Sequence, residues 1–187
     1  MSEIALNIHH LEPTSRVNGP GCRFVIWTQG CTLACPSCFN PDTHSLTAGT
    51  SISLDAITAQ VCEQSEIEGI TFSGGEPLLQ LPALQQFARN IRDNTQLTLL
   101  LFTGFTWEEI QRNPPAADIV KYMDIVIAGR YLHHQRFAKS LIGSTNKTIH
   151  FITDKYCLAD LNGIPGCEID ISTDGTITIS GIDPVNL

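Results

Sequence analysis

The 187-residue chain lacks features that would place it in a membrane, outside the cell or on a nucleic acid. It has no long apolar run and no signal-like N-terminus, so we expect a cytoplasmic protein without a membrane partner. Basic residues are few, with 11 Lys and Arg against 19 Asp and Glu and a formal net charge of −8. That balance argues against a nucleic-acid partner, which requires a broad basic surface.

A second cysteine knuckle is also lacking. The chain has seven cysteines, and in a reducing compartment these are expected to be thiols or metal ligands rather than disulfides. Three of them, Cys31, Cys35 and Cys38, lie in residues 31–38, which read CTLACPSC. Paired Cys-x-x-Cys knuckles normally occur in twos, so a single triplet is unusual for a closed zinc site.

The cysteine triplet fits iron–sulfur chemistry. Three thiolates can hold three irons of a cubane 4Fe–4S cluster and leave the fourth iron open to a ligand that is not protein. Catalytic metal sites keep such an open position, whereas structural sites close their shell. Two alternatives explain the same residues: a zinc knuckle completed by His44 or Cys22, and three ordinary core cysteines.

A second motif follows the cysteines along the chain. Residues 69–77 read GITFSGGEP, an apolar strand that runs into two glycines, an acid and a proline. Gly74 and Gly75 can bring backbone carbonyls close to a ligand because no side chain shields them. Those carbonyls and the Glu76 carboxylate could accept hydrogen bonds from an ammonium group. An ordinary turn at a strand end is the alternative.

Together the two motifs resemble those of the radical S-adenosylmethionine (SAM) enzymes. The resemblance implies that the three cysteines bind a 4Fe–4S cluster and that SAM chelates its open iron. It also implies that Gly74, Gly75 and Glu76 hold the SAM amino group, with the Ser73 hydroxyl in the same pocket. One electron from the cluster would cleave SAM to methionine and a 5′-deoxyadenosyl radical that abstracts hydrogen. A side chain at Gly75 is then expected to weaken SAM binding while iron content stays near normal.

The resemblance is closer to one branch of the radical SAM superfamily. Residues 30–44 (GCTLACPSCFNPDTH), 102–109 (FTGFTWEE) and 142–147 (IGSTNK) resemble the activating enzymes of anaerobic ribonucleotide reductase, and the likeness spans residues 15–153. The resemblance implies a glycyl-radical enzyme as partner and a one-electron donor such as flavodoxin or ferredoxin. A radical SAM enzyme acting on a small molecule or a peptide is the alternative, and a non-catalytic iron–sulfur or zinc module is the least favoured.

Five further residues lie beside these motifs. Asn40 could hydrogen-bond a cluster sulfide or simply shape the loop. The resemblance places Thr103 and Gly104 near SAM, and a strand-to-helix turn that requires glycine is the alternative. Ser144 and Asn146 precede an expected strand, where they could meet the nucleoside or the partner, or only build their loop.

Apolar runs alternate with segments of helical spacing, which predicts an α/β fold with a mostly parallel sheet of about five to six strands. The expected strands are residues 23–28, 69–73, 97–103, 124–128 and 148–153. These are too few to close an eight-stranded barrel, so we expect an open partial (β/α) barrel. A C-terminal β-hairpin is expected around Asp174 and Gly175. Residues 1–156 would form the radical SAM core, and residues 157–187 an extension packed on it rather than a separate domain.

Helix signals lie between these strands. Ser53 is an expected N-cap, and Thr106 begins an expected capping box. Pro82 is placed to open a helix, whereas Pro114 is expected to stop one. Cys62 falls near helical spacing with apolar neighbours and is interpreted as a core thiol.

The strand order also predicts where a site would form. Ligands of parallel α/β sheets lie at the carboxyl ends of the strands. Residues 31–38, 73–76 and 103–104 each follow an expected strand. We therefore expect the three segments to meet at one mouth.

Overall fold

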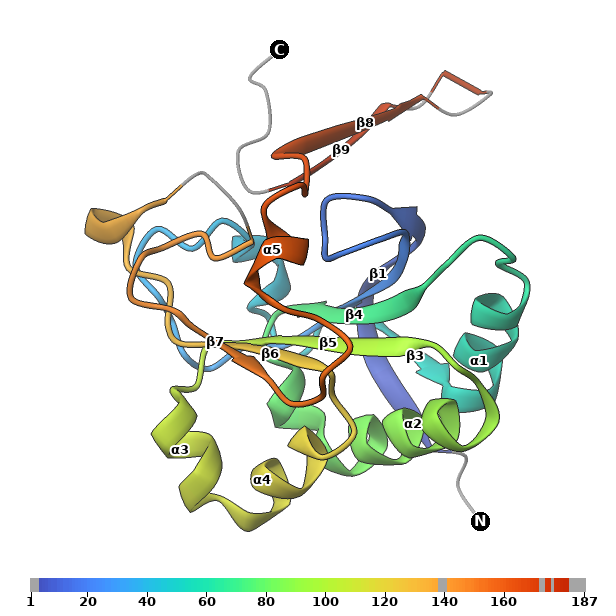
Figure 1. Cartoon of the computed structure of the whole chain (residues 1–187), viewed down its shortest axis with the longest axis horizontal. Coiled ribbons are helices and arrows are strands. Elements are labelled where there is room, and N and C mark those ends of the chain that lie inside the picture. The colour runs from blue at the N-terminus through green and yellow to red at the C-terminus, as the bar shows by residue number, and fades with distance from the viewer. Residues whose placement is uncertain (1–3, 138–140, 172–173, 176, 182–187) are drawn as a thin grey trace.

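A seven-stranded mixed sheet forms the centre of the fold in the computed structural model (Figure 1), which describes residues 4–137, 141–171, 174–175 and 177–181. The strands are β1 (Ala5–Ser15), β2 (Arg23–Thr28), β3 (Thr50–Ser53), β4 (Gly69–Gly74), β5 (Thr98–Thr103), β6 (Ile125–Ala128) and β7 (Thr148–Phe151). Their order across the sheet is β3-β1-β2-β4-β5-β6-β7. The expected α/β class is therefore confirmed, with more strands than the five to six predicted.

The parallel part of the sheet is smaller than expected. β2, β4, β5 and β6 are parallel neighbours, whereas β1 pairs antiparallel with both β2 and β3, and β7 pairs antiparallel with β6. The prediction of a fifth parallel strand at residues 148–153 was wrong in direction. As a consequence, the segment before β7 lies at the carboxyl end of β6.

Two strands were missed altogether because their sequences do not show apolar runs. β1 contains the polar residues His9, His10 and Glu12 and has register shifts that interrupt its alternation. β3 has only four residues. β1 nevertheless occupies an inner position, because β2 and β3 pair on its two sides.

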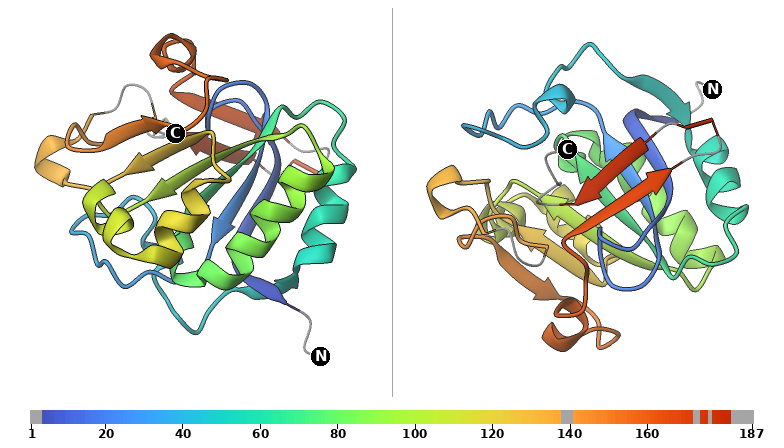
Figure 2. Two further views of the ribbon diagram at one scale, coloured as in Figure 1. Left: turned by 60° about the horizontal axis from the view of Figure 1, so that its bottom comes forward. Right: turned by 90° about the horizontal axis from the view of Figure 1, so that it is seen from above.

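Four helices cover one face of the sheet (Figure 2). They are α1 (Leu54–Cys62), α2 (Leu81–Asn94), α3 (Trp107–Arg112) and α4 (Pro114–Val120). Shorter helical turns are η1 (Pro41–Thr43), η2 (Pro77–Gln80), η3 (His133–Gln135) and α5 (Leu158–Leu161). The expected caps are confirmed: the Ser53 hydroxyl accepts a hydrogen bond from the Ala56 amide, and Thr106 and Glu109 form a capping box.

The expectation that Pro114 stops a helix is confirmed, since α3 ends at Arg112. Pro114 also opens α4, because a proline at a first helical position has no amide that needs a partner. The expectation about Cys62 was wrong. Cys62 is exposed rather than buried. The buried face of α1 is formed by Leu54, Ile57 and Val61, and Cys62 lies about 100° further round the helix from Val61.

Side chains alternate between two apolar layers, as β-strands require. Phe24, Ile26, Ile70 and Phe72 point from β2 and β4 into the layer beneath the four helices. On the opposite face a smaller cluster is covered by the segment after β7, and its buried members are Leu100, Ile125, Ile127, Leu141 and Leu161. The end of this second face near β2 is open to the cavity described below.

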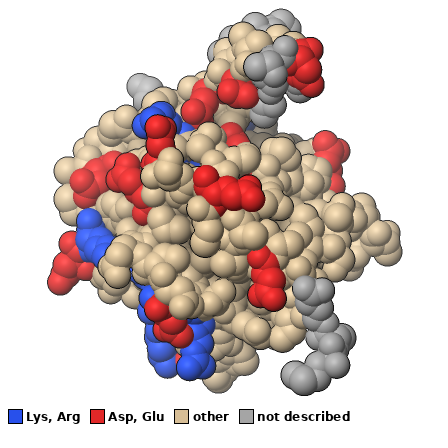
Figure 3. Space-filling view, turned by 90° about the vertical axis from the view of Figure 1, so that its right-hand side faces the viewer, with Lys and Arg blue, Asp and Glu red and all other residues tan. Residues whose placement is uncertain are grey.

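A two-stranded hairpin follows, formed by β8 (Cys167–Ile171) and β9 (Ile177–Gly181). The expected hairpin is confirmed, and Gly175 in its turn has a φ of +86°, which favours glycine. The hairpin lies over the face of the sheet opposite the four helices (Figure 2, right). It projects from the top of the face shown in Figure 3, which carries scattered acidic side chains and a few small groups of basic ones.

Within the described ranges, no helix is both long enough and apolar enough to cross a membrane.

Candidate functional site

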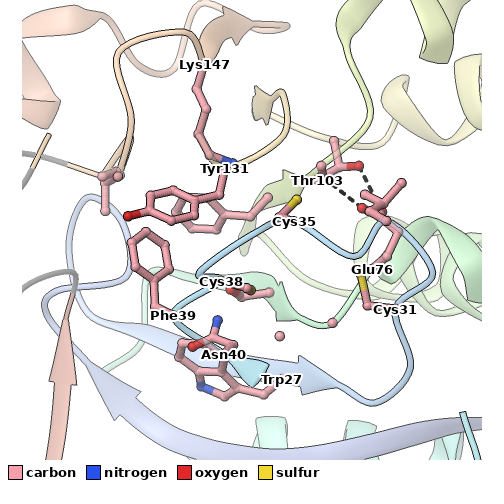
Figure 4. Close-up of a pocket in the computed structure, with 18 of the residues that line it drawn as sticks. Trp27, Cys31, Cys35, Cys38, Phe39, Asn40, Glu76, Thr103, Tyr131 and Lys147 are labelled. Carbon is pink, nitrogen blue, oxygen red and sulfur yellow. Dashed lines mark hydrogen bonds between the residues drawn. The ribbon is translucent and has the colours of Figure 1, made fainter. Parts of the chain in front are cut away.

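A cavity of about 150 Å³ opens at the carboxyl ends of β2, β4 and β5, on the face opposite the four helices (Figure 4). All ten residues proposed from the sequence for cluster and SAM binding line it: Cys31, Cys35, Cys38, Asn40, Ser73, Gly74, Gly75, Glu76, Thr103 and Gly104. The three segments therefore meet at one mouth, as the strand order predicts. The individual roles of these residues stay predictions.

The cysteine loop connects β2 to η1. Its base is fixed by two backbone hydrogen bonds, from the Gly30 amide to the Thr43 carbonyl (2.8 Å) and from the Cys31 amide to the His44 carbonyl (3.2 Å). Ala34 and Ser37 have φ of 47° and 56°, a left-handed conformation that non-glycine residues rarely adopt. Each directly precedes a cysteine, so these turns set the directions of the Cys35 and Cys38 side chains.

The thiols are partly buried, which affects their ionisation. Burial raises the pKa of Cys31 and of Cys38 above the usual value. The Cys35 thiol raises both pKa values further, and Glu76 adds to the effect at Cys31. These thiols therefore favour the protonated state until a metal stabilises the thiolates and displaces the protons.

The donor arrangement argues against the zinc alternatives. Among the described residues, no three His, Cys, Asp or Glu side chains converge closely enough to hold one metal ion. Cys22 is buried and precedes β2, so the length of a six-residue strand, about 20 Å, separates it from Cys31. His44 does line the cavity. The three cysteines line one cavity together, as ligands of one cluster must.

Glu76 connects the ends of β4 and β5. One carboxylate oxygen accepts hydrogen bonds from the Leu78 amide (2.9 Å) and the Thr103 hydroxyl (2.8 Å), and the other accepts one from the Gly104 amide (2.7 Å). The side chain is fully buried. Burial raises its pKa, and the three hydrogen bonds oppose that increase. The carboxylate thus fixes the two strand ends that border the cavity (Figure 4).

The two glycines before Glu76 are packed against the base of the cysteine loop. The Gly75 amide donates to the Thr28 carbonyl and the Glu76 amide to the Gly30 carbonyl. A Cβ at Gly75 would lie 2.4 Å from the Gly30 carbonyl oxygen and 3.0 Å from that of Thr43. This contact argues against the expectation that a side chain at Gly75 spares the iron site, because it would displace the residue directly before Cys31.

Lys147 was not assigned a role from the sequence. It lines the cavity, and its Nζ donates a hydrogen bond to the Gly129 carbonyl (2.6 Å). Burial lowers its pKa, while the nearby Glu76 and cysteine thiols act to raise it. Lys147 reaches the cavity because β7 runs antiparallel to β6, a direction that the sequence pattern did not reveal.

Ser144 and Asn146 lie in the same loop but do not line the cavity. The Asn146 amide group donates to the Arg130 carbonyl, and the Ser144 hydroxyl accepts from the Leu132 amide. The alternative that these residues build their loop is therefore favoured over ligand contact.

Aromatic side chains form another wall that was not predicted. Phe39 and Tyr131 pack with ring centroids 4.2 Å apart, and Trp27 lies across the cavity below Asn40 in Figure 4. Phe39 comes directly after Cys38, whereas Tyr131 comes from the loop after β6. Only their proximity in the fold identifies them as one wall.

Comparison with known proteins agrees with this geometry. A family model described as "4Fe-4S single cluster domain" matches residues 17–150. The anaerobic ribonucleoside-triphosphate reductase-activating protein of Vibrio cholerae is 30% identical over 156 residues, which are 79% of this chain and 99% of that protein. The protein of the same name from Enterobacteria phage T4 is 29% identical over 80% of this chain and 96% of its own length.

Other similarities cover less of the molecule. The pyruvate formate-lyase-activating enzyme of Listeria monocytogenes is 39% identical over 92 residues, which are 46% of this chain and 37% of that enzyme. The crystal structure of QueE from Escherichia coli matches 55% of this chain and 54% of its own, with a TM-score of 0.41 and 17% identity; this match is too weak to carry an argument.

The family match and the relatives imply a 4Fe–4S cluster and SAM as cofactors, and the cavity offers residues that fit both. The chain belongs to the 4Fe-4S single-cluster family of radical SAM proteins, together with the anaerobic ribonucleoside-triphosphate reductase-activating proteins.

Proposed function

We propose that this protein is a radical SAM enzyme that activates a glycyl-radical enzyme such as an anaerobic ribonucleotide reductase. The observation that carries the proposal is a single cavity lined by three cysteines and a Gly-Gly-Glu strand end. The chain that builds it spans 96–99% of the length of two reductase-activating proteins. Support for the partner comes from those names and from the resemblance of the loop segments.

In this proposal Cys31, Cys35 and Cys38 bind three irons of the cluster as thiolates. Backbone carbonyls at Gly74 and Gly75 hold the amino group of SAM, with the Ser73 hydroxyl beside them. When bound, the cluster and SAM supply a hydrogen-abstracting radical by one-electron cleavage of the sulfonium. Per turnover, one electron and one SAM yield methionine, 5′-deoxyadenosine and a glycine-centred radical, as one hydrogen atom leaves the glycine Cα.

Other side chains would position these groups. Glu76 keeps Thr103 and Gly104 beside the glycines through its three hydrogen bonds. Asn40 lines the cavity two residues after Cys38 and would support the cluster loop. The partly buried ammonium of Lys147 would balance part of the negative charge of three thiolates.

The aromatic wall of Phe39 and Tyr131, together with Trp27 across the cavity, would limit the access of water. A dry cavity protects a reactive radical from side reactions.

The finer features of the proposal rest on the sequence. Residues 1–156 would form the radical SAM core as an open partial (β/α) barrel, and residues 157–187 an extension packed on it. The electron donor would be a flavodoxin or a ferredoxin, and the protein would act in the cytoplasm without a nucleic-acid or membrane partner.

The decisive experiment is electron paramagnetic resonance on an anaerobic mixture of the reconstituted protein, a one-electron reductant, SAM and the glycyl-radical enzyme of the host. We expect a carbon-centred radical on the partner, formed together with 5′-deoxyadenosine. Replacing any one of the three cysteines with alanine should abolish both. SAM cleavage without a partner radical, for every glycyl-radical enzyme of the host, would retain the radical SAM class and favour a small molecule or peptide as substrate.

A further inference from the structure

The C-terminal hairpin exposes its apolar face. The pairs Ile169 with Ile179 and Ile171 with Ile177 lie directly opposite each other, and residues two apart on a strand share a face. All four isoleucines therefore lie on one face of the hairpin. Ile169, Ile171 and Ile177 are 46%, 69% and 53% exposed.

The opposite, polar face is attached to the rest of the protein. The Glu168 carboxylate accepts hydrogen bonds from the Ser15 hydroxyl (3.1 Å) and the Arg16 amide (2.9 Å). The Ser180 hydroxyl, which is buried, accepts one from the Asn18 side chain (2.9 Å). These contacts fix which face points outward.

Stability alone would favour the opposite orientation, with the isoleucines packed against the protein and the polar residues in solvent. A register shift of one residue along each strand would turn the isoleucines inward and the polar residues outward. A contiguous exposed apolar face on a protein usually marks an interaction surface. The face therefore calls for a partner that covers it.

The hairpin also borders the candidate site. Gly181, the last residue of β9, lines the same cavity as the three cysteines. The Ser180 hydroxyl also donates a hydrogen bond to the Glu12 carboxylate of β1 (3.3 Å), and β1 pairs with β2, whose Trp27 lines the cavity. The base of the hairpin therefore lies beside the cavity into which the partner must bring its reacting group.

We propose that the isoleucine face of the hairpin, formed by Ile169, Ile171, Ile177 and Ile179, is a docking surface for the glycyl-radical enzyme that this protein activates. The inference rests on the proposed function. A target glycine has no side chain that could reach into the cavity, so the partner's own backbone must come to its mouth and the surrounding surface must meet the rim. The four isoleucine side chains provide apolar area and no hydrogen-bonding groups, so they fit an apolar surface on a protein partner.

The test compares variants of the exposed isoleucines with a matched control. Ile171→Asp and the double variant Ile169→Thr/Ile171→Thr remove the apolar face, and threonine keeps the β-branch that strands favour. Ile4→Asp is the control, because Ile4 is 45% exposed and lies before β1 at the opposite end of the molecule (Figure 1). Two properties are measured: affinity for the purified glycyl-radical enzyme by titration calorimetry, and SAM cleavage by reductant without partner.

Both hairpin variants are expected to bind the partner tenfold or more weakly, the factor that loss of one buried isoleucine gives. Partner-free SAM cleavage and the behaviour of Ile4→Asp should match the wild type. Unchanged partner affinity in both hairpin variants would overturn the proposal. So would a wild-type dimer that the variants convert to monomers without loss of partner affinity, since a second copy would then cover the face. A wild type that binds no glycyl-radical enzyme would refute the proposed function itself.

Discussion

At the scale of single residues, Glu76 shows how one carboxylate can join two strand ends at a site. Three donors already occupy its two oxygens, and all three belong to the protein. An ionised carboxylate can accept about four hydrogen bonds, so Glu76 could also accept one from the amino group of a bound SAM, beside the backbone carbonyls of Gly74 and Gly75. Its three hydrogen bonds within the protein make it a positioning residue as well.

Replacing Glu76 with glutamine should change how stability depends on pH. Burial raises the pKa of Glu76 in the folded protein above its ordinary 4.5. Folding then takes up a proton at pH values between 4.5 and the folded pKa, so stability falls as pH rises through that window, by at most about 1.4 kcal/mol per pH unit. Glu76→Gln has no such proton and should lack this part of the slope.

The measurement is urea unfolding of the metal-depleted protein under reducing conditions, from pH 4 to 7.5. The difference in free energy of unfolding, wild type minus Glu76→Gln, is expected to decrease as pH rises. An increase with pH would mean that the three hydrogen bonds outweigh burial and lower the pKa of the carboxyl.

The site residues that could be predicted from the sequence are those that belong to short motifs of consecutive positions. The cysteine spacing and the Gly-Gly-Glu run are each contained in a few consecutive positions, and the cavity includes all of them. Lys147 and Tyr131 carry no such signal, because each is an ordinary residue until strand direction places it. Their part in the cavity is a property of the fold.

At the scale of elements, the cysteine loop depends on two left-handed residues. Ala34 is exposed and has a φ of 47°, a conformation in which a β-branched side chain is strongly disfavoured. Ala34→Val should therefore disturb the Cys35 side chain without affecting the core. We expect its iron content after anaerobic reconstitution to fall to less than about half of wild type, since strain of roughly 1–2 kcal/mol opposes the bound conformation.

Thr32→Val provides the matched control in the same loop. Thr32 is also exposed, and its φ is not left-handed. Iron and sulfide analysis should give wild-type values for Thr32→Val, and thermal unfolding of both metal-depleted variants should match the wild type. Full iron loading of Ala34→Val would show that the loop conformation is not needed for the cluster.

Elements differ in how well the sequence predicts them. The strands β2, β5 and β6 have continuous apolar runs because both of their faces are largely buried. β1 does not, since its second half is partly exposed and contains His9, His10 and Glu12. The direction of β7 depends on tertiary pairing with β6, which no local pattern encodes.

At the scale of the whole molecule, the two faces of the sheet have different roles. One face is covered by α1 to α4 and supplies most of the core. The other face carries the cavity and the hairpin, which lie next to each other at Gly181. The cavity and the base of the hairpin therefore lie on the same side of the sheet.

The account's central claim is that a hydrogen atom passes from a glycine of the partner to SAM-derived 5′-deoxyadenosine at this cavity. Mass spectrometry of the 5′-deoxyadenosine tests it directly when the glycyl-radical enzyme is labelled with α-deuterated glycine. The account predicts that one deuterium enters the product as the partner radical forms, and that no product forms with the Cys35→Ala variant. Product without deuterium, from every glycyl-radical enzyme of the host, would contradict the claim.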